Sequence, residues 1–219
     1  MGIIALQRQE KMVIASLGRP HQVLSWAVCG GGMAIASDVV WAYFRNTDLP
    51  IGADPVALLR QRLELAGLPG AVGMMTSRNL DHVHTAAVDV GGVQAEAVAT
   101  VGLSNALRVG DPPGRGSVGT INLLVRLSTP LSPAAMVEAI SIATEARTAA
   151  VAAGGWPSRR SGRIATGTGT DCIAIAAPLE GTAQPWCGKH TAEGSAIGQT
   201  TFEVIDAGVR AWIAQRAER

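Results

Sequence analysis

The stretch INLLVRLSTPLSPAAMVEAISIATEARTAAVAAGG, residues 121–155, decides the fold that the sequence predicts. Its first seven residues are mostly apolar and end at a Ser-Thr-Pro turn, which predicts a buried strand over 121–127. Ser132-Pro133 then supplies an N-cap and a first-turn proline, and Gly154-Gly155 ends an alanine-rich helix over 134–153. Because its side chains are small, this helix can pack closely against its neighbours.

The rest of the chain supplies antiparallel strands before this stretch and a long helix after it. Residues 88–98 alternate in polarity around Gly91-Gly92, the pattern of a β-hairpin. Further helices are predicted over 54–67 and 191–216. We therefore expect one α+β domain over residues 1–219, with a mixed, largely antiparallel sheet packed with alanine- and glycine-rich helices.

The composition is that of a compact soluble protein, with 47% hydrophobic residues, 16% charged residues and a net charge of +1. This low charge excludes disordered and coiled-coil chains and provides little field to gather a nucleic acid. No apolar run suits a signal peptide or a membrane span, so neither is expected. Three cysteines without CxxC spacing are typical of reduced thiols and predict a cytoplasmic protein. An exposed apolar helix face would favour a homodimer.

The most unusual segment is Thr166-Gly167-Thr168-Gly169-Thr170-Asp171, which leads into an apolar run. If it is one extended strand, the threonines share one face, and the glycines share the other with Asp171. Interior glycine weakens a strand unless something must approach its backbone, so we expect a ligand to lie against Gly167 and Gly169 and reach the Asp171 carboxylate. The alternative is a bulge in which Asp171 caps a turn. No phosphate-loop motif is present, so a nucleotide site is not predicted.

Two further stretches hold side chains that can act on a polar ligand. Glu145 lies among alanines on the predicted helix and is either a site residue or a solvent-facing glutamate. His190 and Thr191 stand where a loop enters the last helix, with Thr191 as the N-cap. The helix dipole would keep an imidazole there neutral and able to act as a base, unless His190 is an exposed loop residue. No metal-ligand spacing is recognisable, so no metal is expected.

Ser104, Asn105 and Arg108 follow a predicted strand and bring three polar side chains close together in sequence. Asn105 offers both a donor and an acceptor, which suits an amide-rich ligand or a carbonyl that gains negative charge. No GxSxG elbow surrounds Ser104, so Ser104 is not predicted to be a nucleophile.

Five short motifs in series resemble the adenosylcobinamide amidohydrolase family: SNA at 104–106, GTIN at 119–122, TEART at 144–148, TGTGTD at 166–171 and GKHT at 188–191. The resemblance implies hydrolysis of the amide that joins the aminopropanol arm to a propionate of the corrin ring, in corrinoid salvage. The products would be adenosylcobyric acid and 1-aminopropan-2-ol. The corrinoid is then the substrate, and no cofactor is implied.

The predicted catalytic residues are Asp171, His190 and Glu145. Predicted substrate contacts are Ser104, Asn105, Arg108, Asn122, Thr166, Gly167, Thr168, Gly169, Thr170 and Thr191. In the simplest scheme Asp171 or His190 activates water and the other protonates the leaving amine, while Asn105 and backbone N–H groups near Gly167–Gly169 stabilise the oxyanion.

Two alternatives to this scheme remain open from the sequence. The first is self-cleavage between Gly119 and Thr120, which would make Thr120 an N-terminal nucleophile whose own amine serves as the base. The second lies outside catalysis: a corrinoid-binding protein that performs no chemistry. Composition does not separate binding from turnover, because a ligand fringed with amides needs many polar contacts in either case.

Overall fold

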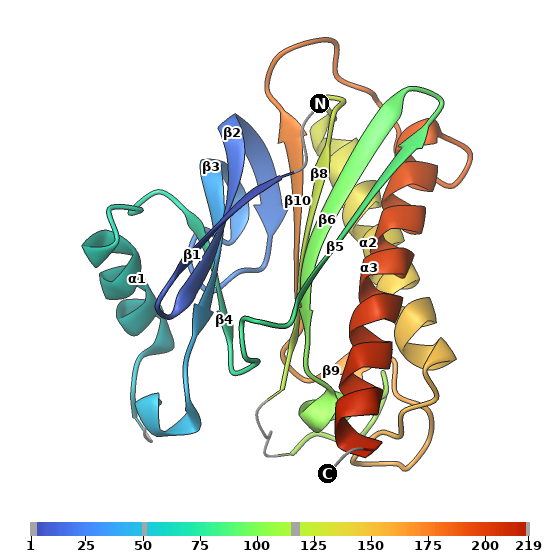
Figure 1. Ribbon diagram of the computed structural model, residues 1–219. Coiled ribbons are helices and arrows are strands. Elements are labelled where there is room, and N and C mark those ends of the chain that lie inside the picture. Colours follow the sequence, from blue (N-terminus) through green and yellow to red (C-terminus); the bar gives the residue numbers. More distant parts are fainter. Residues whose placement is uncertain (1–3, 50–51, 115–118, 218–219) are drawn as a thin grey trace.

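The computed structural model describes residues 4–49, 52–114 and 119–217, and Figure 1 shows their arrangement. An eight-stranded sheet has the strand order β4-β3-β2-β10-β8-β6-β5, and β1 pairs with β2 beside this path. Its strands are β1 (Ala5–Gln9), β2 (Met12–Ser25), β3 (Gly32–Tyr43), β4 (Val72–Thr76), β5 (Val83–Val90), β6 (Val93–Val101), β8 (Ile121–Leu127) and β10 (Cys172–Pro178). A small second sheet pairs β7 (Ala106–Leu107) with β9 (Gly167–Thr168).

The strand and helix predicted from residues 121–155 are present as β8 and α2 (Pro133–Ala153). Ser132 caps α2, its hydroxyl accepting the N–H of Ala135 at 3.2 Å. After α2 the chain returns as β10, which pairs in parallel with β8. Five strand pairings of the large sheet are antiparallel and two are parallel. The predicted α+β fold with a mixed, largely antiparallel sheet is therefore confirmed.

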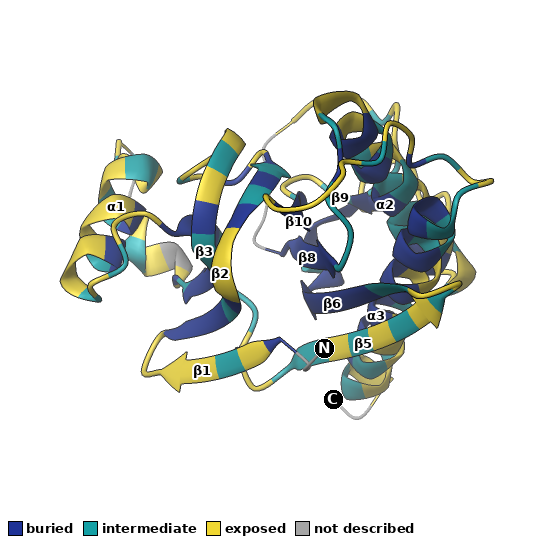
Figure 2. Cartoon of the chain, turned by 90° about the horizontal axis from the view of Figure 1, so that it is seen from above, coloured by how far each residue is buried: buried dark blue, intermediate teal, exposed yellow. Residues whose placement is uncertain are grey.

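Strands β8 and β10 lie in the middle of the molecule and are covered on both faces. Leu123 and Ile173 point into one hydrophobic cluster, under α2 and α3, whereas Leu124 and Ala174 point into another, which includes Trp41 of β3. Every residue of both strands is buried. Figure 2 shows the sheet curling, so that β1, β2 and β3 stand apart from the β10-β8-β6-β5 part. Strands buried on both faces are expected to be mostly apolar, and these two are apolar except at Asn122 and Arg126.

The two remaining helices also begin and end close to the predicted residues. Helix α1 (Pro55–Leu65) is capped by Asp54 and packs beside β4, while α3 (Ala192–Ala217) lies against α2, β5 and β6. The hydroxyl of Thr191 accepts the Gly194 N–H at 3.0 Å, as expected of an N-cap. In the described part of the chain, no helix combines the length and apolarity needed to cross a membrane.

The prediction of one extended strand through the Thr-Gly repeat is wrong. Gly167–Thr168 forms β9, a turn follows at Gly169 and Thr170, and β10 begins only at Cys172. The turn closes because the Asp171 carboxylate accepts the backbone N–H of Thr168, three residues back, at 2.9 Å, together with its hydroxyl at 2.5 Å. The alternative in which Asp171 caps a turn is the one that the structure shows.

Candidate functional site

Three polar segments meet at one end of the large sheet, the lower end in Figure 1. Strands β8 and β10 are parallel neighbours and both begin at this end, whereas β6 is antiparallel and finishes there. The strand register pairs Cys172 with Asn122 and Val101 with Ile121. The residues around these pairs, 102–105, 119–122 and 168–171, therefore come together although they are distant in sequence. We call these three segments the threonine cluster.

A buried ion pair lies under the threonine cluster. Arg147 of α2 binds the Asp171 carboxylate, and the two side chains are only 12% and 7% exposed. The second Asp171 oxygen accepts the Ile121 N–H at 3.1 Å and the Thr168 hydroxyl. One carboxylate thus joins α2, the start of β8 and the turn before β10.

Burial raises the pKa of the Asp171 carboxyl, while the Arg147 guanidinium and the hydrogen bonds from Thr168 and Ile121 act in the opposite direction. All of these donors bind the ionised carboxylate, so both of its oxygens are already used within the protein. Gly167 provides the space for this arrangement, because a Cβ there would overlap the Arg147 guanidinium. The space beside the Gly167 Cα is therefore filled by protein atoms and is not open to a ligand.

The Gly119–Thr120 step lies at the centre of the cluster. Thr120 is buried, with its hydroxyl oxygen 2.7 Å from the Thr170 carbonyl oxygen and 3.2 Å from Asn122 Oδ1. The Thr170 hydroxyl in turn donates to the Gly119 carbonyl at 3.1 Å. Gly119 has a φ of +136°, and a Cβ there would lie 2.5 Å from Ser104 Oγ. Glycine is therefore required at this position.

Two cavities flank the cluster. The first, about 700 Å³, is lined by Asn105, Gly169 and Thr170 together with the loop 107–114 and two arginines. The second, about 630 Å³, is lined by Gly102, Ser104 and Gly119 from the cluster, and by Tyr43, Arg45, Thr47, Ser77, Arg78, Asn79 and Trp212. Residues of the cluster thus form part of the wall of both cavities. Asp171 is not among the described residues that line either of them.

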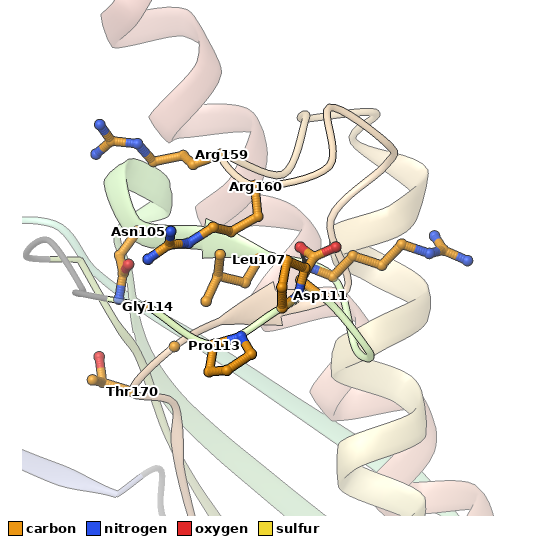
Figure 3. Close-up of a pocket in the computed structure, with 11 residues that line it drawn as sticks. Asn105, Leu107, Asp111, Pro113, Gly114, Arg159, Arg160 and Thr170 are labelled. Carbon is orange, nitrogen blue, oxygen red and sulfur yellow. Dashed lines mark hydrogen bonds between the residues drawn. The ribbon is translucent and has the colours of Figure 1, made fainter.

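Figure 3 shows the arginines of the first cavity pointing in different directions. Arg160 extends across the cavity, and its guanidinium packs against the backbone of Gly114. Arg159 points away, and it donates to the Ser104 carbonyl at 2.8 Å. Arg108 donates to the Ile164 carbonyl at 2.9 Å. Of these three side chains, that of Arg160 reaches across the cavity, where it can contact a ligand.

Several predicted substrate contacts have structural partners instead. Asn122 is 1% exposed and donates to the Met75 carbonyl at 2.8 Å. The Thr166 hydroxyl accepts the Val109 N–H at 2.8 Å and ties two loops together. By contrast, Asn105, Gly169 and Thr170 line the first cavity, as a substrate-binding role requires.

The predicted residues His190 and Thr191 lie at the opposite end of the sheet, whereas Glu145 lies in the middle of α2, two residues before Arg147. Strand β10 leads away from Asp171 over seven residues, about 20 Å, before the loop to α3 begins. His190 is exposed, and Glu145 pairs with Lys189 at 2.6 Å, with both side chains more than half exposed. The structure does not bring His190 and Asp171 together, so the two cannot act on the same bond.

Sequence reasoning assigned no site role to Arg147, nor to the aromatic side chains of the second cavity, whereas it read Arg159, Arg160 and Arg163 as a loop or a small anionic site. Arg147 stands inside the TEART motif, and its charge among alanines was the available signal. Trp26 was also missed: its indole N–H donates to the Asp171 carbonyl at 2.5 Å. The residues of the second cavity come from β3, the loop after β4 and α3, and no sequence pattern links those segments.

A thiol nucleophile is disfavoured at this site. Cys172 directly follows Asp171, and burial raises the pKa of its thiol to about 12. The reactive thiolate is therefore scarce at neutral pH. Hydroxyl groups, the Asn105 and Asn79 amides, arginine guanidinium groups and the Asp111 carboxylate line the cavities. The hydroxyl, amide and guanidinium donors can bind and polarise a carbonyl.

The family match shows a hydrolase that acts on amides, and an α+β fold with these groups beside two cavities is compatible with that class. The family is identified by a family model that matches nearly the whole sequence. The family model described as adenosylcobinamide amidohydrolase matches residues 3–217, and the chain belongs to that family.

Comparisons with individual proteins give only distant likenesses. No curated protein matches the chain. Among solved structures, the PH0078 protein from Pyrococcus horikoshii OT3 is 11% identical, with a TM-score of 0.44 over 98% of this chain and 81% of that one. The L-aminopeptidase D-Ala-esterase/amidase from Ochrobactrum anthropi is 14% identical, with a TM-score of 0.40 over 94% of this chain and 81% of that one. At these scores neither structure bears on the chemistry of this chain.

Proposed function

We propose that the protein hydrolyses the amide that joins the aminopropanol arm to a propionate of the corrin ring in adenosylcobinamide. The products are adenosylcobyric acid and 1-aminopropan-2-ol, and the reaction serves corrinoid salvage. Family membership supports this proposal, and the observation that carries it is the position of the threonine cluster between two cavities. When the scissile amide is held at the wall between the two cavities, one cavity leaves room for the corrin ring and the other for the aminopropanol arm.

The first cavity suits a ligand fringed with amides. The Asn105 amide offers a donor and an acceptor, and Arg160 offers donors to carbonyl oxygens. Hydrogen bonds from protonated donors to the scissile carbonyl strengthen as it gains negative charge, which is the requirement for stabilising a tetrahedral intermediate. In this scheme Asn105 contributes to the oxyanion site.

Asp171 takes a different role in this proposal from the general base considered above. Both of its oxygens are occupied by Arg147, Thr168 and Ile121, and it is screened from the cavities. Asp171 therefore acts as a positioning residue, which holds the Thr168–Thr170 turn against the start of β8. His190 takes no part in the scheme because it lies at the far end of β10, and Glu145 takes none because its carboxylate is exposed and pairs with Lys189.

The decisive experiment is incubation of the purified protein with adenosylcobinamide, followed by mass spectrometry. The proposal predicts time-dependent appearance of adenosylcobyric acid and 1-aminopropan-2-ol. An Asn105→Leu variant serves as the matched test of the cavity wall and should lose most of this rate. Saturable corrinoid binding with no product from folded protein would reject the hydrolase and support a corrinoid-binding protein.

A further inference from the structure

The sequence contains four Gly-Thr steps, and the structure distinguishes one of them: Gly119–Thr120. Only here, among the four, is the threonine buried. The Thr168 hydroxyl is bound to Asp171, the Thr170 hydroxyl donates to Gly119, and Thr182 is exposed in a loop. The Thr120 hydroxyl is therefore the only one of the four that belongs to a buried threonine. It directly follows a glycine whose carbonyl already accepts a hydroxyl donor.

We propose that the chain cleaves its own backbone between Gly119 and Thr120. The Thr120 hydroxyl oxygen adds to the Gly119 carbonyl carbon, the Gly119–Thr120 C–N bond breaks, and the hydroxyl proton ends on the Thr120 nitrogen. Water then hydrolyses the resulting ester, leaving a carboxylate on Gly119 and restoring the Thr120 hydroxyl. The net change is the addition of one water molecule, and no other reactant is required.

The surroundings of the Gly119 carbonyl favour this step. The hydrogen bond from the Thr170 hydroxyl, at 3.1 Å, withdraws electron density from the carbonyl and can stabilise the oxyanion that forms during attack. Gly119 holds a φ of +136°, and an added Cβ would meet Ser104 Oγ, so only glycine presents its carbonyl to Thr170 in this way. Gly119 also lines the second cavity beside Ser104, so water can reach the ester.

The residues after the cut are held in place independently of it. The Thr120 carbonyl accepts the Gly102 N–H at 3.0 Å, and the Ile121 N–H donates to Asp171. Beyond Ile121, β8 lies between β6 and β10. The new N-terminus would therefore keep its position in the cluster.

The cut provides a further base beside a hydroxyl, at Thr120 itself. A free Thr120 amine lies next to its own hydroxyl and can accept the proton when that hydroxyl attacks the substrate. This role as nucleophile rests on the proposed function, whereas the self-cleavage does not, because it needs no corrinoid. Thr120 then forms an ester with the corrin propionate, 1-aminopropan-2-ol leaves, and water frees adenosylcobyric acid.

The test is the intact mass of the purified protein, without substrate, followed over time. We expect two fragments, residues 1–119 and 120–219, that elute together on size exclusion because β8 and β10 pair with strands of the first fragment. Thr120→Val should remain one chain, Thr120→Ser should still be cut, and Thr170→Val should be cut at least tenfold more slowly. All three variants should retain the wild-type circular dichroism spectrum.

The outcomes separate this inference from the proposed function. A wild-type chain that stays intact, whether or not it hydrolyses adenosylcobinamide, overturns the self-cleavage, and so does a cut at another bond. A chain that is cut at Thr120 and yet releases no adenosylcobyric acid upholds the self-cleavage and counts against the proposed function.

Discussion

Two ion pairs that contain predicted catalytic carboxylates start from neighbouring positions of α2, Glu145 and Arg147, and their environments are opposite. In one pair the Asp171 side chain is 7% exposed and joins three segments through Arg147, Thr168 and Ile121. In the other pair the side chains of Glu145 and Lys189 are 59% and 66% exposed. Each pair joins a carboxylate to a cation, yet only the buried pair is tied to a network next to cavities.

This difference shows that burial decides how much the loss of an ion pair destabilises the protein. Exposed pairs are screened by water and stabilise a protein by about 0–1 kcal/mol. Breaking a buried pair by removing one partner costs about 3–5 kcal/mol, because a desolvated charge is left behind. The buried pair can therefore fix the geometry of the threonine cluster, whereas the exposed pair holds little in place.

The largest effect is expected from Asp171→Asn. Loss of the charge leaves Arg147 buried without its counterion, so the free energy of unfolding should fall by about 3 kcal/mol. Displacement of the threonine cluster should slow amide hydrolysis by about 100-fold. Thermal unfolding and product formation below the melting temperature of the variant measure both.

Glu180→Gln is the matched control for Asp171→Asn. It breaks the exposed pair between Arg19 and Glu180 and should change neither stability nor rate. Folded Asp171→Asn protein with wild-type activity would remove the distinction between the buried ion pair and the exposed ones.

The next effect tests the space beside the buried pair. Gly167→Ala places a Cβ against the Arg147 guanidinium and should destabilise the protein by about 1–3 kcal/mol. Gly70→Ala, where no atom lies within 4 Å of the added Cβ, is the control and should be neutral. Chemical denaturation of the two variants gives the comparison. Equal stabilities would mean that the Gly167 site is not tightly packed.

A smaller, pH-dependent change in the free energy of unfolding is expected from His21, a buried titratable group that belongs to neither ion pair. Burial lowers the pKa of His21, which is only 2% exposed. The unfolded chain therefore binds a proton more readily, and stability should fall as the pH drops through 6.5, by at most about 1.4 kcal/mol per pH unit. His21→Gln should flatten this dependence in urea denaturation between pH 7.5 and 5.5. An unchanged slope would place the titration elsewhere.

The smallest effects are expected at exposed residues outside the threonine cluster. Glu145→Gln and His190→Gln should each change the free energy of unfolding by less than about 0.5 kcal/mol and leave the hydrolysis rate unaltered. A large fall in rate with normal stability in either variant would restore that residue to the reaction. For His190 it would also mean that the chemistry takes place at the end away from the threonine cluster.

The sequence predicts the elements of this fold well because their signals are local. The Ser132 and Asp54 caps, the Gly91-Gly92 turn and the apolar run of β8 each act within a few residues. The Thr-Gly repeat is different: its period of two favours a strand, but the Asp171 carboxylate closes a turn through Thr168. A hydrogen bond from a side chain overrides the pattern there.

The candidate site could be predicted only in part. TGTGTD, GTIN and SNA do converge, since β6, β8 and β10 share one end of the sheet. Which residues face a cavity depends on the pairing of β8 with β10, and this is not readable from either strand alone. For this reason Asp171 and Asn122 turn out buried, and His190 lies at the other end.

The central position of β10 has a consequence for how the protein is made. This strand pairs with β8 on one side and with β2 on the other, so that Pro178 lies opposite His21. During synthesis the ribosome must deliver residues up to 178 before residues 21–25 of β2, already paired with β3, receive β10 on their other side, and until then that strand edge is open to other chains. We expect folding to be slow and newly made chains to depend on chaperones that shield that edge.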